Sequence, residues 1–266
     1  MKSLLSLLSE TQLDANLLNE AERFNVHRLT LQKKRMIREV FSEFHHDIMM
    51  LDRKYFENVE GLRIELGAGV CPIRDTYPDV LATDVVSDPS LDLVLDALSM
   101  DLADGSVRAL YGQNCFHHFS KAELFFQEVA RVIAPGGGVI LVEPYYGPFA
   151  RLIFTRLFET ESFDMGAEEW ENVAEGPMVG ANQALSFIVF VRDRRLFEQR
   201  FPQLEIIYNA PFHNYLRYLL SGGVNFKQIV PDALIGMVKL FEKLLRPISS
   251  YLALHHVIVV KRRQSI

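Results

Sequence analysis

Acidic and glycine residues in the first half of the chain stand where nucleoside recognition needs them. Glu65-Leu66-Gly67-Ala68-Gly69 closes a short apolar run, Asp84 closes the next run, and Asp96-Ala97 closes a third. Glycines let the backbone pass close to a ligand. A carboxylate after the second run can accept both hydroxyl hydrogens of a ribose, and one after the third can accept an adenine amino group. Each acid alone would also fit a helix cap or a solvated loop, but together they predict a nucleoside site.

Two adjacent histidines, His117 and His118, follow a fourth apolar run. An unperturbed imidazole has a pKa of about 6.5, which suits proton transfer at neutral pH. Neighbouring side chains on extended backbone point in opposite directions, so we expect one ring to face a reacting group and the other to pack. We favour His117 as the base or orienting group. The alternative is that both rings are structural and only shape the loop.

The segments that position these residues alternate between strands and helices. Short apolar runs bounded by Gly, Pro or Asp predict strands at 62–66, 80–84, 91–96, 107–111, 139–143, 204–208 and 254–260. Helical spacing predicts helices within 12–58 and at 121–134, 182–200 and 232–245. Pro135-Gly136-Gly137-Gly138 is expected to stop the helix at 121–134, in which Leu124 and Phe125 face inward. The pattern predicts an α/β fold with a mainly parallel, doubly wound sheet.

No repeat or convincing linker divides the chain, so we expect one domain over residues 1–266. Within it we expect an N-terminal helical extension (1–60), a ligand-binding core (61–147), a helical lid or acceptor region (148–202), and C-terminal strands with a helix (203–266). The lid region is rich in aromatic residues, namely Phe149, Phe154, Phe158, Phe163 and Trp170.

Residues 62–144 resemble the core of class I S-adenosylmethionine (SAM)-dependent methyltransferases. The Glu65-to-Gly69 segment resembles the first motif of that family, Asp84 its ribose acid, and Asp96-Ala97 its adenine-side acid. The run Phe116-His117-His118-Phe119, followed by Glu128, Ala130-Arg131-Val132 and Pro135-Gly136-Gly137, is similar to the type 11 subgroup. The resemblance implies a Rossmann-like, seven-stranded sheet with one antiparallel strand, SAM as cofactor, and Asn114 at the methionine end of the cofactor.

The sequence departs from the family pattern at Cys71, where a third glycine is common. Pro72 then suits the first position of a following helix, where its missing N–H costs nothing. A dinucleotide fingerprint would need glycine at position 72, so an NAD-dependent oxidoreductase is the weaker enzyme interpretation.

The acceptor is less constrained than the cofactor. Glu143, Tyr145 and Tyr146 follow the fifth predicted strand, and Glu161 and Asp164 lie in the lid region, so these side chains are candidates for contacts with an acceptor. Flanking segments, including Glu161-Ser162-Phe163-Asp164 and Gly180-Ala181-Asn182, resemble bacterial methyltransferases of surface-polysaccharide synthesis, which implies a glycan acceptor. Two alternatives stay open: a small aromatic or lipid-like acceptor, and a SAM-binding module without catalytic activity.

Composition narrows the other partners. The formal net charge is −6, so nucleic acid is not an expected partner. Two cysteines far apart in sequence and the lack of a convincing signal peptide or membrane span favour a reduced, cytoplasmic protein. No Cys–His set has zinc spacing, so we expect no metal. The apolar stretch Leu216–Leu245, which carries several basic residues, fits a peripheral membrane contact, a buried helix or a homodimer face.

Overall fold

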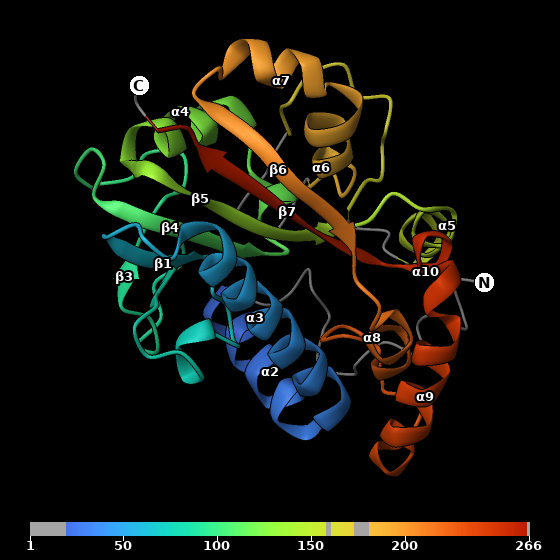
Figure 1. The fold of residues 1–266 in the computed structure, drawn as a ribbon. Coiled ribbons are helices and arrows are strands. Elements are labelled where there is room, and N and C mark those ends of the chain that lie inside the picture. Colours follow the sequence, from blue (N-terminus) through green and yellow to red (C-terminus); the bar gives the residue numbers. More distant parts are fainter. Residues whose placement is uncertain (1–19, 158–160, 173–180, 265–266) are drawn as a thin grey trace.

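A seven-stranded sheet forms the centre of the computed structural model, which describes residues 20–157, 161–172 and 181–264 (Figure 1). The strands are β1 (Leu62–Leu66), β2 (Leu81–Asp84), β3 (Leu93–Val94), β4 (Val107–Gln113), β5 (Ile133–Pro144), β6 (Leu204–Pro211) and β7 (His255–Arg262). Their order in the sheet is β3-β2-β1-β4-β5-β7-β6. Strands β1 to β5 pair in parallel, and β7 is antiparallel to both β5 and β6. The predicted α/β class, with a mostly parallel sheet and one antiparallel strand, is confirmed.

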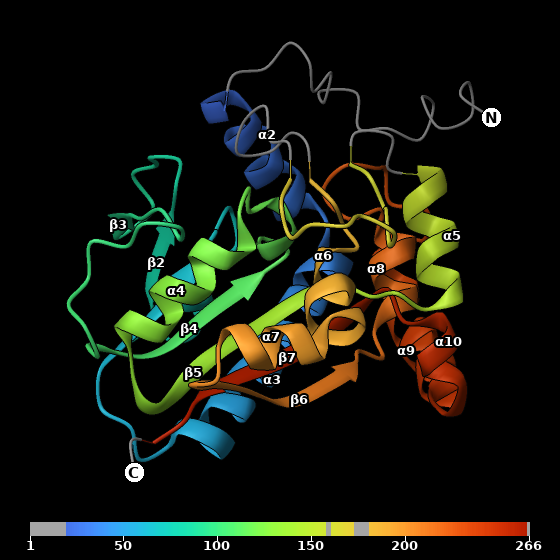
Figure 2. The ribbon, with the colours of Figure 1, turned by 90° about the horizontal axis from the view of Figure 1, so that it is seen from above.

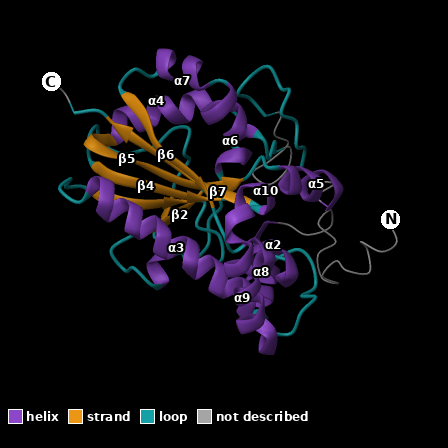
Figure 3. Ribbon diagram, turned by 45° about the vertical axis from the view of Figure 1, so that its right-hand side comes forward, coloured by secondary structure: helices purple, strands orange, loops and turns teal. Residues whose placement is uncertain are grey.

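Helices cover both faces of this sheet (Figures 2 and 3). They are α2 (Glu20–Lys33), α3 (Arg35–Phe56), α4 (Ala122–Val132), α5 (Pro148–Leu157), α6 (Leu185–Phe187), α7 (Arg194–Arg200), α8 (Tyr215–Ser221), α9 (Ile235–Leu245) and α10 (Ser249–Leu252). One face packs against α3, and the other packs against α4, α6 and α7. Within the described residues, no helix has the length and apolar composition needed to cross a membrane.

Alternation along the central strands explains their continuous apolar sequences. On β5, Ile140 and Val142 pack toward α3, whereas Val139 and Leu141 pack toward α4. Strand β7 divides in the same way between its odd and even positions. Because both faces are covered, residues 136–144 of β5 and 255–260 of β7 are all buried, and no polar alternation is left to mark the strand period.

The N-terminal helices are interrupted at Lys34, although no Gly or Pro stands there. Lys34 adopts an extended conformation between α2 and α3. Its buried ammonium donates to the carbonyl oxygens of Gly223 (3.1 Å) and Phe226, just beyond α8. The break therefore lets a lysine turn inward and bind carbonyl groups that follow the end of a distant helix.

The Pro135–Gly138 run does not separate helix from strand as predicted, because β5 already begins at Ile133. Val107 of β4 pairs with Ile133, and Ala109 pairs with Gly138, so the run forms an irregularity inside the strand pair. A Cβ on Gly138 would lie 2.2 Å from the Val260 oxygen and 2.6 Å from the ring of Phe56. Glycine is needed there so that α3 can pack against the sheet.

Three other local predictions need correction. No α-helix follows β1: Pro72 precedes only a short 3₁₀ turn, η1 (Ile73–Asp75), so its predicted role at the start of a helix is wrong. Strand β3 covers only Leu93–Val94 of the predicted range 91–96, and it lies at the edge of the sheet beside β2. On α4, Leu124 is 39% exposed, and Phe125 and Phe126 make the inward contact.

The second half of the chain keeps its predicted elements with altered detail. The helical stretch at 182–200 consists of α6, a π-helical segment η3 (Ile188–Arg192) and α7. The stretch at 232–245 consists of a 3₁₀ turn, η4 (Asp232–Leu234), and α9; a second 3₁₀ turn, η5 (Arg246–Ile248), leads into α10. Trp170, expected in the lid, is buried against Phe197 and donates to Asp193 at 2.9 Å. Phe158 lies outside the described residues.

Candidate active site

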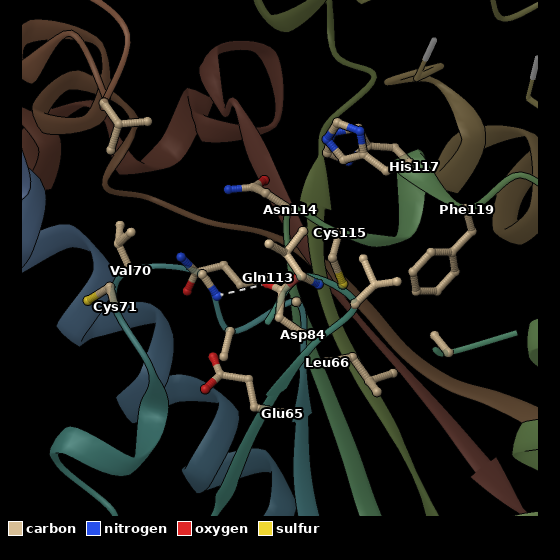
Figure 4. A pocket seen from close by; sticks show the side chains of 18 of the residues that line it. Glu65, Leu66, Val70, Cys71, Asp84, Gln113, Asn114, Cys115, His117 and Phe119 are labelled. Atoms are coloured by element: carbon tan, nitrogen blue, oxygen red, sulfur yellow. Dashed lines mark hydrogen bonds between the residues drawn. The ribbon is translucent and has the colours of Figure 1, made fainter. Parts of the chain in front are cut away.

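The sheet order reverses between β1 and β4, and a cavity of about 500 Å³ lies beyond the carboxyl ends of these strands. Such a switch point is where open α/β sheets bind ligands. The loops after β1, β2, β3 and β4 all contribute to the cavity wall, as do side chains from α2, α3, α5 and α8. Figure 4 labels Val70, Asp84 and Asn114 among the lining side chains. The nucleoside-type residues predicted from the sequence are therefore brought together at one site.

The turn after β1 is shaped by its two glycines. Gly67 has φ +62°, and a Cβ there would lie 2.8 Å from the Cβ of Cys115. Gly69 has φ +54°, but a Cβ there would meet nothing closer than 3.8 Å. The first glycine thus lets the turn approach the loop after β4, and the second leaves open space beside the backbone.

Two acids stand at the ends of the next strands. Asp84 lines the cavity beside the turn, and its Oδ2 accepts the N–H of Gly69 at 3.2 Å. Burial raises the pKa of Asp84 above its ordinary value. Asp96 follows β3, is exposed, and accepts the N–H of Leu98 at 2.9 Å, while Ala97 beside it is buried in the cavity wall. Both carboxylates keep oxygen lone pairs for a ligand.

Glu65 stabilises the turn after β1 through a buried hydrogen bond. Its carboxyl group is buried and accepts the N–H of Ile73 at 2.7 Å, which ties the end of β1 to η1. Burial raises its pKa well above the usual range. Cys71, at the position of the missing third glycine, also lines the cavity; burial and then the nearby Glu65 raise its thiol pKa to about 12. The two cysteines of the chain are both free thiols.

The loop after β4 is organised by Glu143 of β5. This fully buried carboxylate accepts the backbone N–H groups of Cys115 (3.0 Å), Phe116 (2.8 Å) and His117 (3.3 Å), and it contacts Nδ1 of His117 at 2.6 Å. Asn114 precedes this turn with φ +52°, a conformation that asparagine tolerates, and its side chain lies at the cavity (Figure 4). Glu143 therefore holds both the backbone and the imidazole ring of His117 in place.

The contacts of His117 define its chemistry. With Glu143 ionised, Nδ1 carries the proton and donates it, which leaves Nε2 as the basic nitrogen. Nε2 lies 3.8 Å from Oε2 of Glu161, a cavity-lining residue. Burial acts to lower the pKa of His117, but the carboxylates of Glu143 and Glu161 outweigh it, so the pKa lies above its ordinary value.

His118 is the neutral member of the pair. Burial, followed by the nearby His117, lowers its pKa to about 3. Its Nδ1 is a buried atom without a hydrogen-bond partner, and Oε1 of Gln183 and Oε1 of Gln113 share that condition. All three side chains line the cavity. Buried polar atoms nearly always have a hydrogen-bond partner, so these three atoms are suited to form hydrogen bonds with a polar ligand in the cavity.

His117, His118 and Glu161 also bring three possible metal-binding atoms within 4.8 Å of one another. The two histidine Nε2 atoms lie 3.8 and 4.0 Å from the Glu161 oxygens. Two ligands at about 2.0 Å from a tetrahedral zinc ion would lie about 3.3 Å apart. Oε2 of Glu161 is moreover bound by Gln183 at 2.6 Å. The expectation of a metal-free site stays a prediction.

The predicted acceptor residues separate into two groups. Glu161 lies in the cavity wall, whereas Glu143, Tyr146 and Asp164 are not among the lining residues. Tyr146 packs against Tyr145, and Asp164 is an exposed turn residue that accepts the N–H of Gly166 at 2.8 Å. Glu143 belongs to the support of His117.

Several lining residues were missed by the sequence reasoning. Phe24 of α2, Phe41 of α3, Tyr218 of α8 and His255 of β7 reach the cavity, as does Phe154 from the predicted lid. His255 faces the cavity, whereas the adjacent His256 bonds Ser186 (2.9 Å) and Asn209 (2.9 Å). No local motif marks these positions, because tertiary packing alone brings them to the site.

A family comparison bears on the same region. Residues 74–141 match the model of the type 11 methyltransferase family, described as "Methyltransferase domain". The matched segment includes Asp84, Asp96 and His117, and it begins after the Gly67–Gly69 turn. SAM is the methyl donor expected from the resemblance, and the turn, the strand-end acids and the unsatisfied polar atoms fit it. No curated protein has a sequence that matches the chain significantly.

Solved structures with a similar arrangement include several methyltransferases. Geranyl diphosphate C-methyltransferase from Streptomyces coelicolor is 11% identical, with a TM-score of 0.46 and coverage of 84% of this chain and 81% of that one. Phosphoethanolamine N-methyltransferase 2 from Haemonchus contortus is 9% identical, with a TM-score of 0.45 and coverage of 83% and 53%. The YcgJ protein from Bacillus subtilis is 14% identical, with a TM-score of 0.46 and coverage of 84% and 100%.

Proposed function

Because residues 74–141 match the model of a methyltransferase domain, we propose that the reaction of this chain is the SAM-dependent O-methylation of a sugar or glycan precursor. The observation that carries this proposal is the series of contacts from buried Glu143 through His117 to Glu161. It puts a basic nitrogen and a carboxylate together on the cavity wall. A hydroxyl acceptor needs a group that takes its proton and groups that bind its neighbouring hydroxyls, and this end of the cavity offers both.

The turn and the strand-end acids would hold the cofactor. Asp84 would bind the ribose hydroxyls, Asp96 and Ala97 would lie at the adenine, and Asn114 would lie toward the methionine end. Glu65 would act through the turn, since its carboxyl group is already bonded to Ile73. When bound, SAM supplies an electrophilic methyl group on a positively charged sulfur. The protein itself must position the acceptor for an in-line displacement.

His117 would accept the proton of the attacking hydroxyl at Nε2. The imidazole would thereby become an imidazolium, and the buried carboxylate of Glu143 would stabilise that charge at Nδ1. Three backbone N–H groups already hold the Glu143 carboxylate in the position from which it would stabilise the imidazolium. Its carboxylate therefore does not need to reorganise during the reaction.

Glu161 and Gln183 would bind the acceptor. Their side chains are joined at 2.6 Å, and Oε1 of the amide is unsatisfied. A carboxylate beside an amide accepts and donates, which suits the paired hydroxyls of a sugar ring. The resemblance of the flanking segments to surface-polysaccharide methyltransferases favours the same class, whether the glycan is free or lipid-linked.

A small aromatic or lipid-like acceptor is the second candidate. The rings of Phe24, Phe41 and Phe154 line the same cavity and favour an acceptor with an apolar portion. The carboxylate of Glu161 would then have no sugar hydroxyl to bind.

The two candidates are separated by transfer of a labelled methyl group. The protein is incubated with methyl-labelled SAM and two acceptor panels, one of bacterial nucleotide-sugar and glycan precursors and one of quinones and other phenolic compounds. The proposal expects a labelled methyl ether on the first panel and a marked rise in KM with Glu161→Gln. Labelling confined to the phenolic panel, with no effect of Glu161→Gln, would favour the second candidate.

A further inference from the structure

An apolar strip lies exposed along the outer side of α9 and continues through η5 into α10. We call it the outer strip, and it consists of Leu234, Met237, Leu240, Phe241, Leu244, Ile248 and Tyr251. Each side chain is at least 39% exposed, and Leu240, Leu244 and Tyr251 exceed half. Spacings of three and four residues put the strip on one side of the helix, while Ile235, Val238 and Glu242 face the protein. A soluble surface seldom gathers so many large apolar side chains.

Three basic side chains flank the outer strip, and the acid at its start, Asp232, is half-buried and accepts hydrogen bonds from Met36 and Gln228. Lys239, Lys243 and Arg246 are exposed beside it, although the whole chain has a net charge of −6. The acidic residue between positions 233 and 252 is Glu242, which is buried and bound to Arg217 at 2.6 Å. Lys239 is paired with Glu39 at 2.7 Å. Within the described part of the chain, Lys243 and Arg246 have no salt bridge, so their charges are available to a partner.

We propose that the outer strip is a membrane-binding face that rests on the surface of an anionic phospholipid bilayer. An apolar helix side with lysine and arginine beside it is the arrangement that inserts at the boundary between headgroups and acyl chains. Anionic headgroups would neutralise Lys243 and Arg246. A second copy of the chain fits less well, because a two-fold contact would bring the same cations of both copies together.

The outer strip lies near the cavity, so membrane binding through it would place the cavity close to the bilayer. Helices α5, α8, α9 and α10 gather at one end of the molecule (Figures 1 and 2). Phe154 of α5 and Tyr215 of α8 share one apolar cluster with Leu245 and Leu252, which flank the outer strip. Phe154 and Tyr218 also line the cavity. Membrane binding would thus bring a lipid-linked acceptor close to the active site. This benefit rests on the proposed function, whereas membrane binding itself does not rest on it.

Co-sedimentation of the full chain with phospholipid vesicles tests the proposal. We expect binding to vesicles of equal parts phosphatidylcholine and phosphatidylglycerol, and markedly weaker binding to phosphatidylcholine alone. Substituting Lys243→Gln and Arg246→Gln should weaken binding to the anionic vesicles about fivefold for each cation removed. High salt should weaken it in the same direction.

A matched pair of double variants isolates the apolar contribution. Leu240→Gln with Leu244→Gln should reduce vesicle binding by at least about tenfold, since two inserted side chains are lost. Leu124→Gln with Leu196→Gln, two exposed leucines on α4 and α7 at the opposite end of the molecule, should bind vesicles like the parent. All four positions are solvent-exposed, so both double variants should keep the circular dichroism spectrum and the SAM affinity of the parent.

Two results would overturn the proposal. One is the absence of vesicle binding at either composition. The other is a dimer in size-exclusion light scattering that Leu240→Gln with Leu244→Gln dissociates while vesicle binding stays unchanged, which would assign the strip to a second copy. Neither result touches the methyl-transfer proposal, because transfer to a soluble acceptor is measured without vesicles and should survive in the outer-strip variants.

Discussion

Nδ1 of His117 lies 2.6 Å from a carboxylate oxygen of Glu143, and both side chains are buried. The loop after β4 and the end of β5 are thereby joined at the point where the cavity meets the sheet. A neutral His117 in this contact keeps its free nitrogen toward the cavity. The pair therefore has the arrangement of a general base and the group that orients it.

The pH dependence of the reaction should report this pair. A base must be deprotonated to act, so the rate should rise as the pH rises through the pKa of His117, which lies above its ordinary value. In Glu143→Gln the stronger of the two carboxylates that raise the pKa of His117 is lost, whereas burial, which lowers this pKa, remains. The rising limb of the kcat profile should then move to lower pH, while kcat at its plateau falls by at least about tenfold because the favoured tautomer is lost.

Glu205→Gln, an exposed position on β6, is the matched control and should leave the profile unchanged. A limb that stays in place in Glu143→Gln would mean that another group titrates.

Asp84 should govern cofactor affinity. Removing a carboxylate that binds ribose hydroxyls costs about 1.5–3 kcal/mol, so Asp84→Ala should bind SAM about 10- to 100-fold more weakly in calorimetry. Asp101→Ala, at an exposed acid after β3 that does not line the cavity, should bind SAM like the parent. If Asp84→Ala also bound like the parent, the ribose assignment would be wrong.

The turn after β1 should be sensitive to a single methyl group. Gly67 and Gly105 share a positive φ, +62° and +65°, but a Cβ at Gly67 meets Cys115 at 2.8 Å and one at Gly105 meets nothing within 4 Å. Gly105→Ala should cost about 1 kcal/mol of unfolding free energy from backbone strain, and Gly67→Ala about 1–3 kcal/mol more. Denaturant unfolding measures both, and equal losses would show that the Cys115 contact has no energetic consequence.

Chelation should leave the enzyme active. The separations among His117, His118 and Glu161 are longer than zinc requires, so dialysis against EDTA should not change kcat or SAM affinity. Loss of activity that returns on adding a divalent cation would make the three residues a metal site and remove His117 from the role of base.

Much of the sheet could be predicted from local sequence. Strand β1 has its predicted bounds because an apolar run meets Gly67, where only a positive φ continues the chain. Asp84 at the end of β2 and Asp96 after β3 could be placed at one edge of the sheet, because parallel strands end on the same side. These features depend on a few neighbouring residues and on the handedness of the crossovers.

Other features depend on partners that local patterns do not reveal. The Pro135–Gly138 run reads as a turn, yet pairing with β4 and β7 holds Gly138 in a strand. Glu143 reads as an acceptor residue at the end of a strand, but four donors of the β4 loop surround it. Phe24, Phe41 and His255 reach the cavity from elements far apart in sequence. In each case tertiary packing decides a role that the residue type leaves open.

The most direct test of the account is the methyl-transfer rate of His117→Ala beside its affinity for SAM. With labelled SAM and the acceptor identified from the glycan panel, the variant should lose about 10²- to 10⁴-fold in kcat, the range of general-base catalysis. Its SAM dissociation constant should stay within about threefold of the parent, because the role proposed for His117 concerns the acceptor and not the nucleoside. Full activity of His117→Ala on that acceptor would contradict the account.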